Sequence, residues 1–485
     1  MMKRLYTLII VLATSLFLPV RSQALVGDPV SITIHLRGVH QSKISLLALN
    51  KSQLFKPIEE IPVVMNGETV RFSVAPEHLP GEFVIRFDYK ELSGSTPYPA
   101  EKSLLVGHQD LELWVSPKFC NNSDSTWFQP NESENATLNR FMTRSREMTA
   151  QLGLLQNLLM NYDAPGTDFY QRAVTEYNAR RTRFHKWVDS CSMADQHLFV
   201  SNLYNFEKIP AIRFTGNETD RLNNLIDHYF DEMSFAKPLL IRTQKLYQYM
   251  NNYINLTGQK CTTEALRDSL IPAAARVAVE KAKRGHPQVY GWMVDYFYRG
   301  FEANGIGAGM KVLEPYINDP ACLTAKRYEI QRRLDGMRTL TAGIQAPDIE
   351  LPDSEGKPFK LSSFKNGKPF NLIVFWSADC AHCLETIALL HPWSTEPARQ
   401  EALNVIAVSL DETDTEIEKW ISKIPSLTTW RHLRAAEGVR SKVASDYFIL
   451  ATPVMVLVDA STGKILAMPD TPAALKKEME QRTKR

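Results

Sequence analysis

The chain has 485 residues, which is too long for a single hydrophobic core and predicts about two to four domains. Hydrophobic residues make up 44% of the chain and charged residues 23%, a balance typical of globular proteins and not of disordered or polytopic membrane chains. The formal net charge is only +2, so no bulk field indicates nucleic acid or an acidic membrane as a partner.

The first residues have the order of a secretory signal peptide. A basic start, MMKR, precedes the apolar run LYTLIIVLATSLFLPV, and small residues then favour cleavage after Ala24. The rival interpretation is an uncleaved membrane anchor, because the apolar run approaches the length of a membrane span. No later segment is long and apolar enough to cross a membrane. We therefore predict a signal peptide over residues 1–24 and a mature protein outside the cytosol.

Residues 25–118 are predicted to form an antiparallel, β-sandwich-like domain. Short apolar runs such as SITIHL, TVRFSV and EFVIRFDY alternate with polar positions, and Asn66-Gly67 and Pro80-Gly81 separate them. This pattern is typical of small β-sandwiches. The histidines of this region are scattered, and they predict neither a catalytic cluster nor a metal site.

Residues 123–342 are predicted to be helical. Leu138 and Phe141, and then Met148, Leu152 and Leu155, are spaced three or four residues apart, as on one face of an amphipathic helix. Later segments, among them QVYGWMVDYFYRGFEA, continue the pattern. We interpret the aromatic residues of that segment as core, and the Arg-rich segment NARRTRFHK as a solvated helix face.

Residues 343–485 are predicted to form an α/β domain. The runs NLIVFW, NVIAVSL and TPVMVLVD suit buried strands, and helical patterns lie between and after them. Thr413 or Asp414 is expected to cap the helix TDTEIEKWISKI. Alternating strands and helices predict a sheet that is covered on both faces.

The six cysteines divide into a close pair and four scattered residues. The pair is Cys380 and Cys383, in the segment FWSADCAHCLET. The scattered residues have no metal-ligand spacing, and it is open whether they form disulfides or remain thiols: Cys120, Cys191, Cys261 and Cys322.

The close pair is best explained as a redox pair. A zinc site needs further ligands, and His382 and His391 do not supply the usual spacing, so no metal is predicted. A structural disulfide across two residues would constrain very little of the unfolded chain. At a helix start, by contrast, free amide groups and the helix dipole favour a thiolate on Cys380. Cys383, one turn later, is placed to attack a mixed disulfide formed on Cys380.

These segments together resemble a TlpA/ResA-like redoxin domain of the thioredoxin fold. GIQAPD with LSSFKNGK is similar to the N-terminal hairpin of the family, VFWSADCAHC to its active-site motif, and DYFILATPVMVLVD to its cis-proline segment. The resemblance implies thiol–disulfide exchange without a bound cofactor. It also implies that Pro453 is the cis-proline, that Thr452 and Pro453 hold an extended substrate, and that Trp376 shapes the surface beside the site. The preceding regions resemble, more loosely, those of multidomain envelope proteins of Gram-negative bacteria, which implies a periplasmic location.

The chain departs from the family pattern behind the cysteine pair. Many members have a buried glutamate three residues after the second cysteine, where this chain has Thr386 and, one place earlier, Glu385. Proton transfer is therefore expected to use Glu385, Asp379 or water. His382 either stabilises the Cys380 thiolate, which would favour oxidation of substrates, or is a solvated loop residue.

The sequence thus predicts a periplasmic thiol–disulfide oxidoreductase, with the reductase direction favoured by the resemblance. Its expected partners are protein disulfides or thiols and a membrane or periplasmic electron donor or acceptor, and not nucleic acid. A peroxiredoxin is disfavoured, because Ser377 and Ile373 stand where a peroxidatic motif has threonine and proline. The alternative from another class is a redox-gated binding or scaffold protein of the cell envelope. The client, the electron donor and the oligomeric state stay open.

Overall fold

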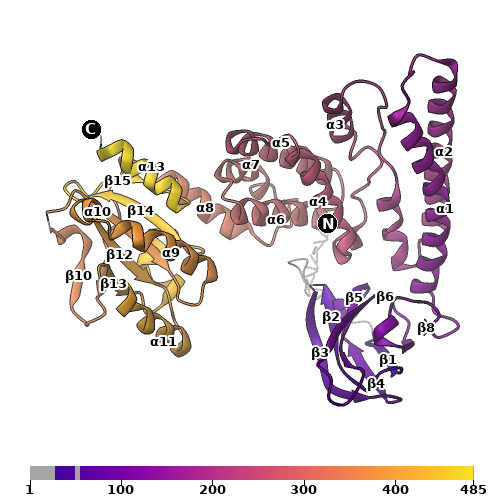
Figure 1. The fold of residues 1–485 in the computed structure, drawn as a ribbon, viewed down its shortest axis with the longest axis horizontal. Coiled ribbons are helices and arrows are strands. Elements are labelled where there is room, and N and C mark those ends of the chain that lie inside the picture. Colours follow the sequence, from indigo (N-terminus) through magenta and orange to yellow (C-terminus); the bar gives the residue numbers. More distant parts are fainter. Residues whose placement is uncertain (1–27, 50–54, 366, 484–485) are drawn as a thin grey trace, which may run out of the picture. The chain divides into compact units, whose positions relative to one another are not determined.

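The structure is a computed structural model that describes residues 28–49, 55–365 and 367–483 (Figure 1). The predicted signal peptide and the rival anchor fall on residues outside these ranges. The chain forms two compact units, one of Met1–Lys208 with Arg242–Tyr247 and one of Ile209–Ile241 with Gln248–Arg485. None of the helices in the described ranges has the length and apolar character needed to span a membrane.

The first unit contains a β-sandwich, as predicted. Its sheets have the orders β4-β1-β7-β8 and β3-β2-β5-β6. Burial alternates along β1, and its inward residues share one core with inward residues of β5 in the other sheet. The strands are β1 (Val30–Leu36), β2 (Gln41–Leu49), β3 (Phe55–Met65), β4 (Thr69–Val74), β5 (Gly81–Lys90), β6 (Tyr98–Val106), β7 (Leu111–Val115) and β8 (Thr126–Phe128).

Two details of the sandwich differ from the prediction. β1 and β7 pair in parallel, whereas the other pairs of the sandwich are antiparallel. No hairpin joins these two strands, because the intervening chain passes through both sheets, so nothing forces an antiparallel pairing. β8 also lies beyond residue 118, where the domain was predicted to end. This short strand still belongs to the sandwich, because it pairs with β7.

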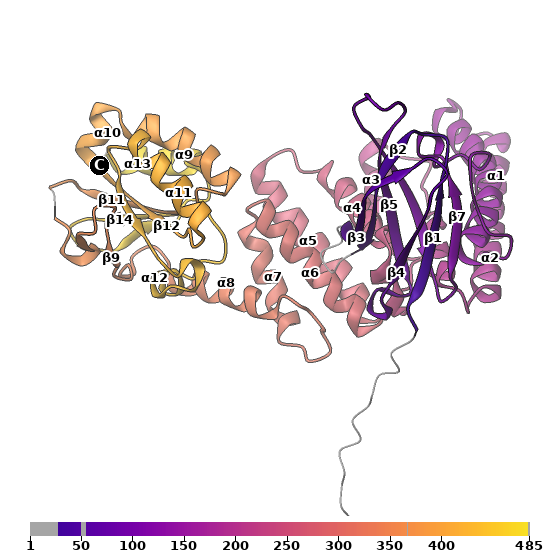
Figure 2. The same ribbon diagram turned by 90° about the horizontal axis from the view of Figure 1, so that it is seen from below.

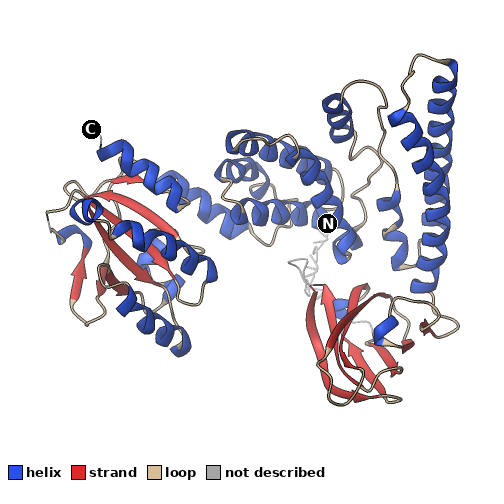
Figure 3. Ribbon diagram, viewed as in Figure 1, coloured by secondary structure: helices blue, strands red, loops and turns tan. Residues whose placement is uncertain are grey.

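A long helical hairpin belongs to the same unit. Its helices, α1 (Glu134–Asn161) and α2 (Asp168–Ala194), lie side by side (Figure 3). The buried Glu134 carboxylate accepts hydrogen bonds from the backbone N–H groups of Phe199 and Val200, both at 2.8 Å. Glu82 of β5 likewise accepts from the Thr243 hydroxyl at 2.8 Å and the Gln244 backbone N–H at 2.7 Å. Residues 242–247 thus return to the sandwich, and the predicted helical region is shared between the two units.

The second unit contains the remaining helices of this region. Trp292 and Tyr298 of the aromatic-rich helix are buried, which agrees with their interpretation as core. α4 begins in the first unit and continues into the second. The helices are α3 (Glu218–Asp227), α4 (Gln244–Gly258), α5 (Glu264–Lys283), α6 (Pro287–Ala303), α7 (Gly307–Ile317) and α8 (Arg327–Thr339).

The predicted α/β domain is a five-stranded sheet covered on both faces (Figure 2). Its order is β13-β12-β11-β14-β15, in which the first three strands are parallel and β14 and β15 pair in antiparallel fashion. The thioredoxin-like fold and the multidomain organisation were therefore predicted correctly. The strands are β9 (Glu350–Pro352), β10 (Pro358–Lys360), β11 (Phe370–Trp376), β12 (Leu403–Ser409), β13 (Arg431–Arg434), β14 (Val454–Asp459) and β15 (Ile465–Ala467).

Two separate cores hold the helices of this domain against the sheet. One core contains inward residues of α9, α11 and α13, and the other contains residues of α12. Thr413 caps α11, with its hydroxyl accepting from the Glu416 backbone N–H at 3.3 Å, as predicted. The helices are α9 (Ala381–Ser394), α10 (Pro397–Ala402), α11 (Asp414–Lys423), α12 (Lys442–Asp446) and α13 (Pro472–Thr483).

The last helix before this domain is packed onto it. The Arg332 guanidinium of α8 donates to the carbonyl oxygens of Ala444 and Ser445, both at 3.3 Å, at the end of α12. Its carbon Cζ also lies 5.7 Å from the centre of the Phe448 ring. Leu340, directly after α8, belongs to the core that contains α12.

A buried histidine makes the stability of this domain sensitive to acid. His432 on β13 is 4% exposed, and burial lowers its pKa. Histidine in an unfolded chain titrates near about 6.5. The stabilisation is therefore complete above that pH and is lost as the pH falls toward the lowered pKa of the folded state. We expect the urea concentration at the unfolding midpoint to be lower at about pH 5.5 than at about pH 7.5. This decrease should be smaller in His432→Asn.

The matched control for this experiment is His382→Asn. This variant makes the same substitution at a side chain that is 73% exposed, so it separates the effect of the buried histidine from that of a histidine-to-asparagine change at the surface. His391, whose pKa is also lowered by burial, is present in both variants. Equal pH dependence in His432→Asn and the wild type would contradict the prediction.

Candidate functional site

Cys380 directly precedes α9 and caps its N-terminus. β11 ends at Trp376, a short loop follows, and Cys380 is the N-cap residue with an extended backbone at φ −91° and ψ 109°. Its sulfur accepts a hydrogen bond from the Cys383 backbone N–H at 3.2 Å. Free N–H groups and the positive end of the helix dipole thus surround this sulfur, which is half-buried.

Cys383 lies one helical turn later and is shielded from solvent. It is 0% exposed and belongs to the core on the α9 face of the sheet. Burial raises the pKa of the Cys383 thiol, and the neighbouring Cys380 sulfur raises it further. Both cysteines are free thiols in the structure. The pair therefore consists of one accessible sulfur and one protected sulfur.

The segment before β14 lies against Cys380. The peptide bond between Thr452 and Pro453 is cis. The Thr452 carbonyl oxygen accepts from the Cys380 thiol, with a distance of 3.7 Å between sulfur and oxygen. Four residues singled out from the sequence are thus brought together from two distant segments.

Trp376 has a different place from the predicted one. It was expected to shape the surface beside the site, but its side chain is 0% exposed. As the last residue of the buried strand β11, it packs in the same core as Cys383. The prediction of a surface role is wrong, because this position of the strand faces the covering helices.

Glu385 and His382 lie on the outside of α9. The His382 Nδ1 atom is 3.5 Å from Glu385 Oε2, and the two side chains are 73% and 76% exposed. Glu385 therefore does not replace the buried glutamate of the family. Asp379 is also turned outward, where it pairs with Lys419 of α11. The carboxylates considered from the sequence do not lie behind the cysteine pair.

A buried carboxylate that sequence reasoning missed holds the loop before Cys380. Asp411 is 1% exposed and lies two residues after the end of β12. Its Oδ1 accepts from the Ser377 hydroxyl at 2.7 Å and from the Ala378 backbone N–H at 2.9 Å. Its Oδ2 accepts from the Ser409 hydroxyl at 2.6 Å. The sequence feature that could have identified Asp411 is its position just after a predicted parallel strand. The carboxyl ends of parallel strands lie at the same edge of the sheet as the cysteine motif.

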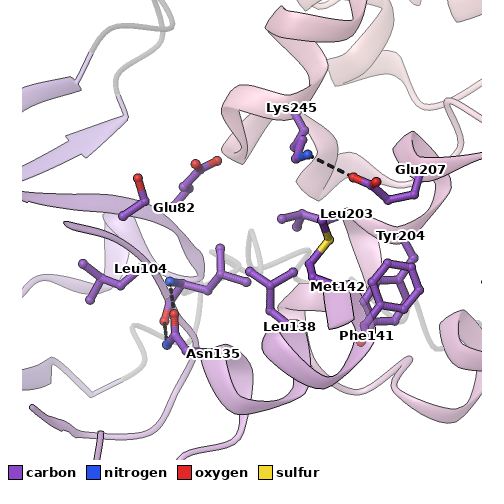
Figure 4. A pocket seen from close by; sticks show the side chains of 12 residues that line it. Glu82, Leu104, Asn135, Leu138, Phe141, Met142, Leu203, Tyr204, Glu207 and Lys245 are labelled. Carbon is purple, nitrogen blue, oxygen red and sulfur yellow. Dashed lines mark hydrogen bonds and ion pairs between the residues drawn. The ribbon is translucent and has the colours of Figure 1, made fainter. Parts of the chain in front are cut away.

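A cavity of about 170 Å³ lies in the first unit, and none of the predicted site residues lines it (Figure 4). Leu138 and Met142 of α1 contribute apolar walls, and Lys245 Nζ lies 3.0 Å from Glu207 Oε1 at its polar side. The lining contains neither cysteine nor histidine.

The scattered cysteines are unpaired thiols in the structure. They are Cys120, Cys191, Cys261 and Cys322. In the described ranges, no three or more side chains of His, Cys, Asp and Glu gather as metal ligands would.

A family model and several solved structures match parts of this chain. Residues 342–468 match the model of the AhpC/TSA family. Among solved structures, a C-terminal domain of a putative thiol-disulfide oxidoreductase from Bacteroides thetaiotaomicron is 26% identical, with a TM-score of 0.27 and coverage of 30% of this chain and 96% of that one.

Two further structures are similar. A thioredoxin domain of a thiol-disulfide oxidoreductase from Bacteroides vulgatus is 27% identical over 30% of this chain and 98% of that one, with a TM-score of 0.26. A thioredoxin-like protein from Bacteroides caccae is 18% identical over 57% of this chain and 98% of that one, with a TM-score of 0.40. With the match over residues 342–468 and the sheet described above, the C-terminal part of this multidomain chain is a redoxin domain of the AhpC/TSA family with a thioredoxin-like fold.

Proposed function

We propose that this protein is a thiol–disulfide oxidoreductase that exchanges electrons with protein disulfides through Cys380 and Cys383. The observation that carries the proposal is the pairing of one half-buried sulfur at a helix start with one fully buried sulfur a turn later. The first suits attack on a bulky substrate, and the second is protected from any partner but the first.

The chemistry balances within the pair and its substrate. The Cys380 thiolate attacks one sulfur of a substrate disulfide, forms a mixed disulfide and releases the other substrate sulfur, which takes up a proton. The Cys383 thiol then loses its proton and attacks the Cys380 sulfur, which releases the second substrate thiol. The substrate gains two electrons and the pair becomes a disulfide, which a membrane or periplasmic electron donor reduces again.

The cis-proline segment is the proposed holding site for the substrate chain. The Thr452 carbonyl lies 3.7 Å from the Cys380 sulfur, so a polypeptide that pairs with this backbone would present its disulfide to that sulfur. Strand addition of this kind takes affinity from main-chain hydrogen bonds and accepts many sequences.

We propose the reductase direction and a periplasmic location. The direction is supported by His382, which lies beside Glu385 on the exposed side of α9 and thus fits the solvated alternative. The location is supported by the order of basic, apolar and small residues at the start of the sequence.

Trapping of mixed disulfides tests the proposal in cells. In Cys383→Ala the second step is blocked, so we expect a defined set of proteins bound to Cys380 that a reductant releases. The measurement is affinity purification from the periplasmic fraction, followed by mass spectrometry before and after reduction.

The matched control is the double variant Cys380→Ser/Cys383→Ala, which has no sulfur at either position and should trap nothing. An equal set of proteins on both variants would contradict the enzyme and favour the binding or scaffold alternative. Recovery of the protein only in the cytosolic fraction would contradict the proposed location.

A further inference from the structure

A second cavity of the molecule is lined in part by residues that flank the cis-proline segment in the sequence. It has a volume of about 240 Å³ and lies within the second unit, between helices α6 to α8 and the redoxin domain. A dry cavity of about 150 Å³ lined by aliphatic and aromatic side chains is large enough to hold benzene. The space therefore suffices for one large apolar side chain.

Two of the residues that line the cavity flank the cis-proline segment in the sequence. Ile449 and Val454 line it, and they bracket the residues from Leu450 to Pro453. Val454 also pairs with Phe375 of β11, one residue before the strand ends and the cysteine loop begins. In the sequence, Thr452 thus lies between the two lining residues, and its carbonyl oxygen contacts the Cys380 sulfur.

The cavity has an apolar wall that is rich in methionine and a charged side. Met310 and Met337 come from the helical region, and Met468 follows β15 in the redoxin domain. Methionine side chains are unbranched and polarizable, and they adapt to apolar groups of different shapes. On the charged side, Glu302 and Arg333 form an ion pair at 3.1 Å, and burial raises the pKa of the Asp470 carboxyl, which disfavours its charged form.

The helical wall is held firmly against the redoxin domain. Besides the contacts of Arg332, α8 approaches Phe448 closely, since a Cβ added to Gly336 would lie only 2.9 Å from the Cβ of Phe448. Phe448 has a positive φ of 51°, which is sterically disfavoured for a bulky residue. Such a backbone persists only where its surroundings fix it, so this wall is pre-organised.

We propose that this cavity is a specificity pocket, which receives one large apolar side chain of the extended polypeptide whose disulfide reacts at Cys380. The helical region thereby selects among substrates. The inference rests on the proposed function, because it assumes a polypeptide held along the cis-proline segment. Pockets that take individual side chains are the usual source of specificity when a chain is bound through its backbone.

A set of peptides tests the pocket. Each peptide has a cysteine in a Gly/Ser sequence, disulfide-bonded to the chromophore thionitrobenzoate, and a single leucine at one of the positions two to four residues before or after the cysteine. Release of the chromophore by the fully reduced protein gives a second-order rate constant. Thionitrobenzoate linked to 2-mercaptoethanol, which has no peptide chain, is the reference substrate.

Gly307→Phe is the variant that fills the pocket. Gly307 lines the cavity, and a Cβ at this residue meets only Met337 Cε at an ordinary 3.7 Å, so a side chain fits on the backbone and occupies the space. Gly300→Phe is the matched control, because a Cβ there has no neighbour within 4 Å and Gly300 lies outside the lining on the same helical region. Thermal unfolding of both variants verifies that they are folded.

We expect the wild type to react about tenfold faster with at least one leucine peptide than with the all-Gly/Ser peptide. Gly307→Phe should reduce this ratio to within about twofold, and Gly300→Phe should retain it. Equal rates for all peptides in the wild type, or an unchanged ratio in Gly307→Phe, would overturn the specificity pocket. Absence of any reaction with the reference substrate would instead contradict the proposed function itself.

Discussion

Replacing Cys380 with serine is expected to lower the rate of insulin disulfide reduction by at least about a thousandfold. A serine hydroxyl at the start of α9 does not ionise near neutral pH and forms no bond with a substrate sulfur. Cys383 cannot take over, because it is 0% exposed and its pKa is raised by burial. The measurement is the turbidity of precipitating insulin chains with dithiothreitol as the electron donor.

The control for this variant is Cys191→Ser, which removes a cysteine that is also half-buried but lies in the first unit on α2. Its rate should equal that of the wild type. A loss of less than about tenfold in Cys380→Ser would show that another thiol carries the exchange.

Replacing Asp411 with alanine is expected to lower the free energy of unfolding of the second unit by about 3 kcal/mol. The carboxylate accepts hydrogen bonds from three groups, and its loss leaves the Ala378 N–H and two hydroxyl groups without their acceptor in the protein interior. Since two of these groups belong to the loop before Cys380, the rate of disulfide reduction should fall as well. Urea unfolding and the insulin assay measure the two effects.

Asp411→Asn separates the position of the loop from the stability of the fold. The amide oxygen retains part of the hydrogen bonding, so this variant should recover more of the rate than Asp411→Ala. Asp414→Ala, three residues later in the exposed first turn of α11, is the matched control and should change neither quantity. Equal rates in Asp411→Ala and the wild type would show that the loop is positioned without this carboxylate.

The parts of the fold with a local signal were predictable from the sequence. Alternating and continuous apolar runs predicted the sandwich strands and the buried strands beside Cys380, because the period of burial follows directly from strand geometry. The spacing of Cys380 and Cys383 predicted a nucleophile at a helix start and a second thiol one turn later. The structure has both sulfurs in these places.

The features that sequence reasoning missed depend on contacts between distant segments. The parallel pairing of β1 with β7 has no local pattern, since neither strand differs from its antiparallel neighbours. Glu385 was considered because it is close in sequence to the cysteines, yet helix geometry turns it outward. Asp411 lies 31 residues after Cys380 in the numbering, and only the parallel arrangement of β11 and β12 brings it to the same loop.

The return of residues 242–247 to the sandwich has a practical consequence for dissecting the protein. The first unit is discontinuous in the chain, so a fragment that stops at residue 208 lacks the hydroxyl and amide groups that satisfy the Glu82 carboxylate. A fragment that starts at residue 209 would carry those same groups with nothing to bind. Truncation boundaries placed at the end of the hairpin would therefore damage both halves, and a soluble redoxin fragment is better started near the last helix before residue 342.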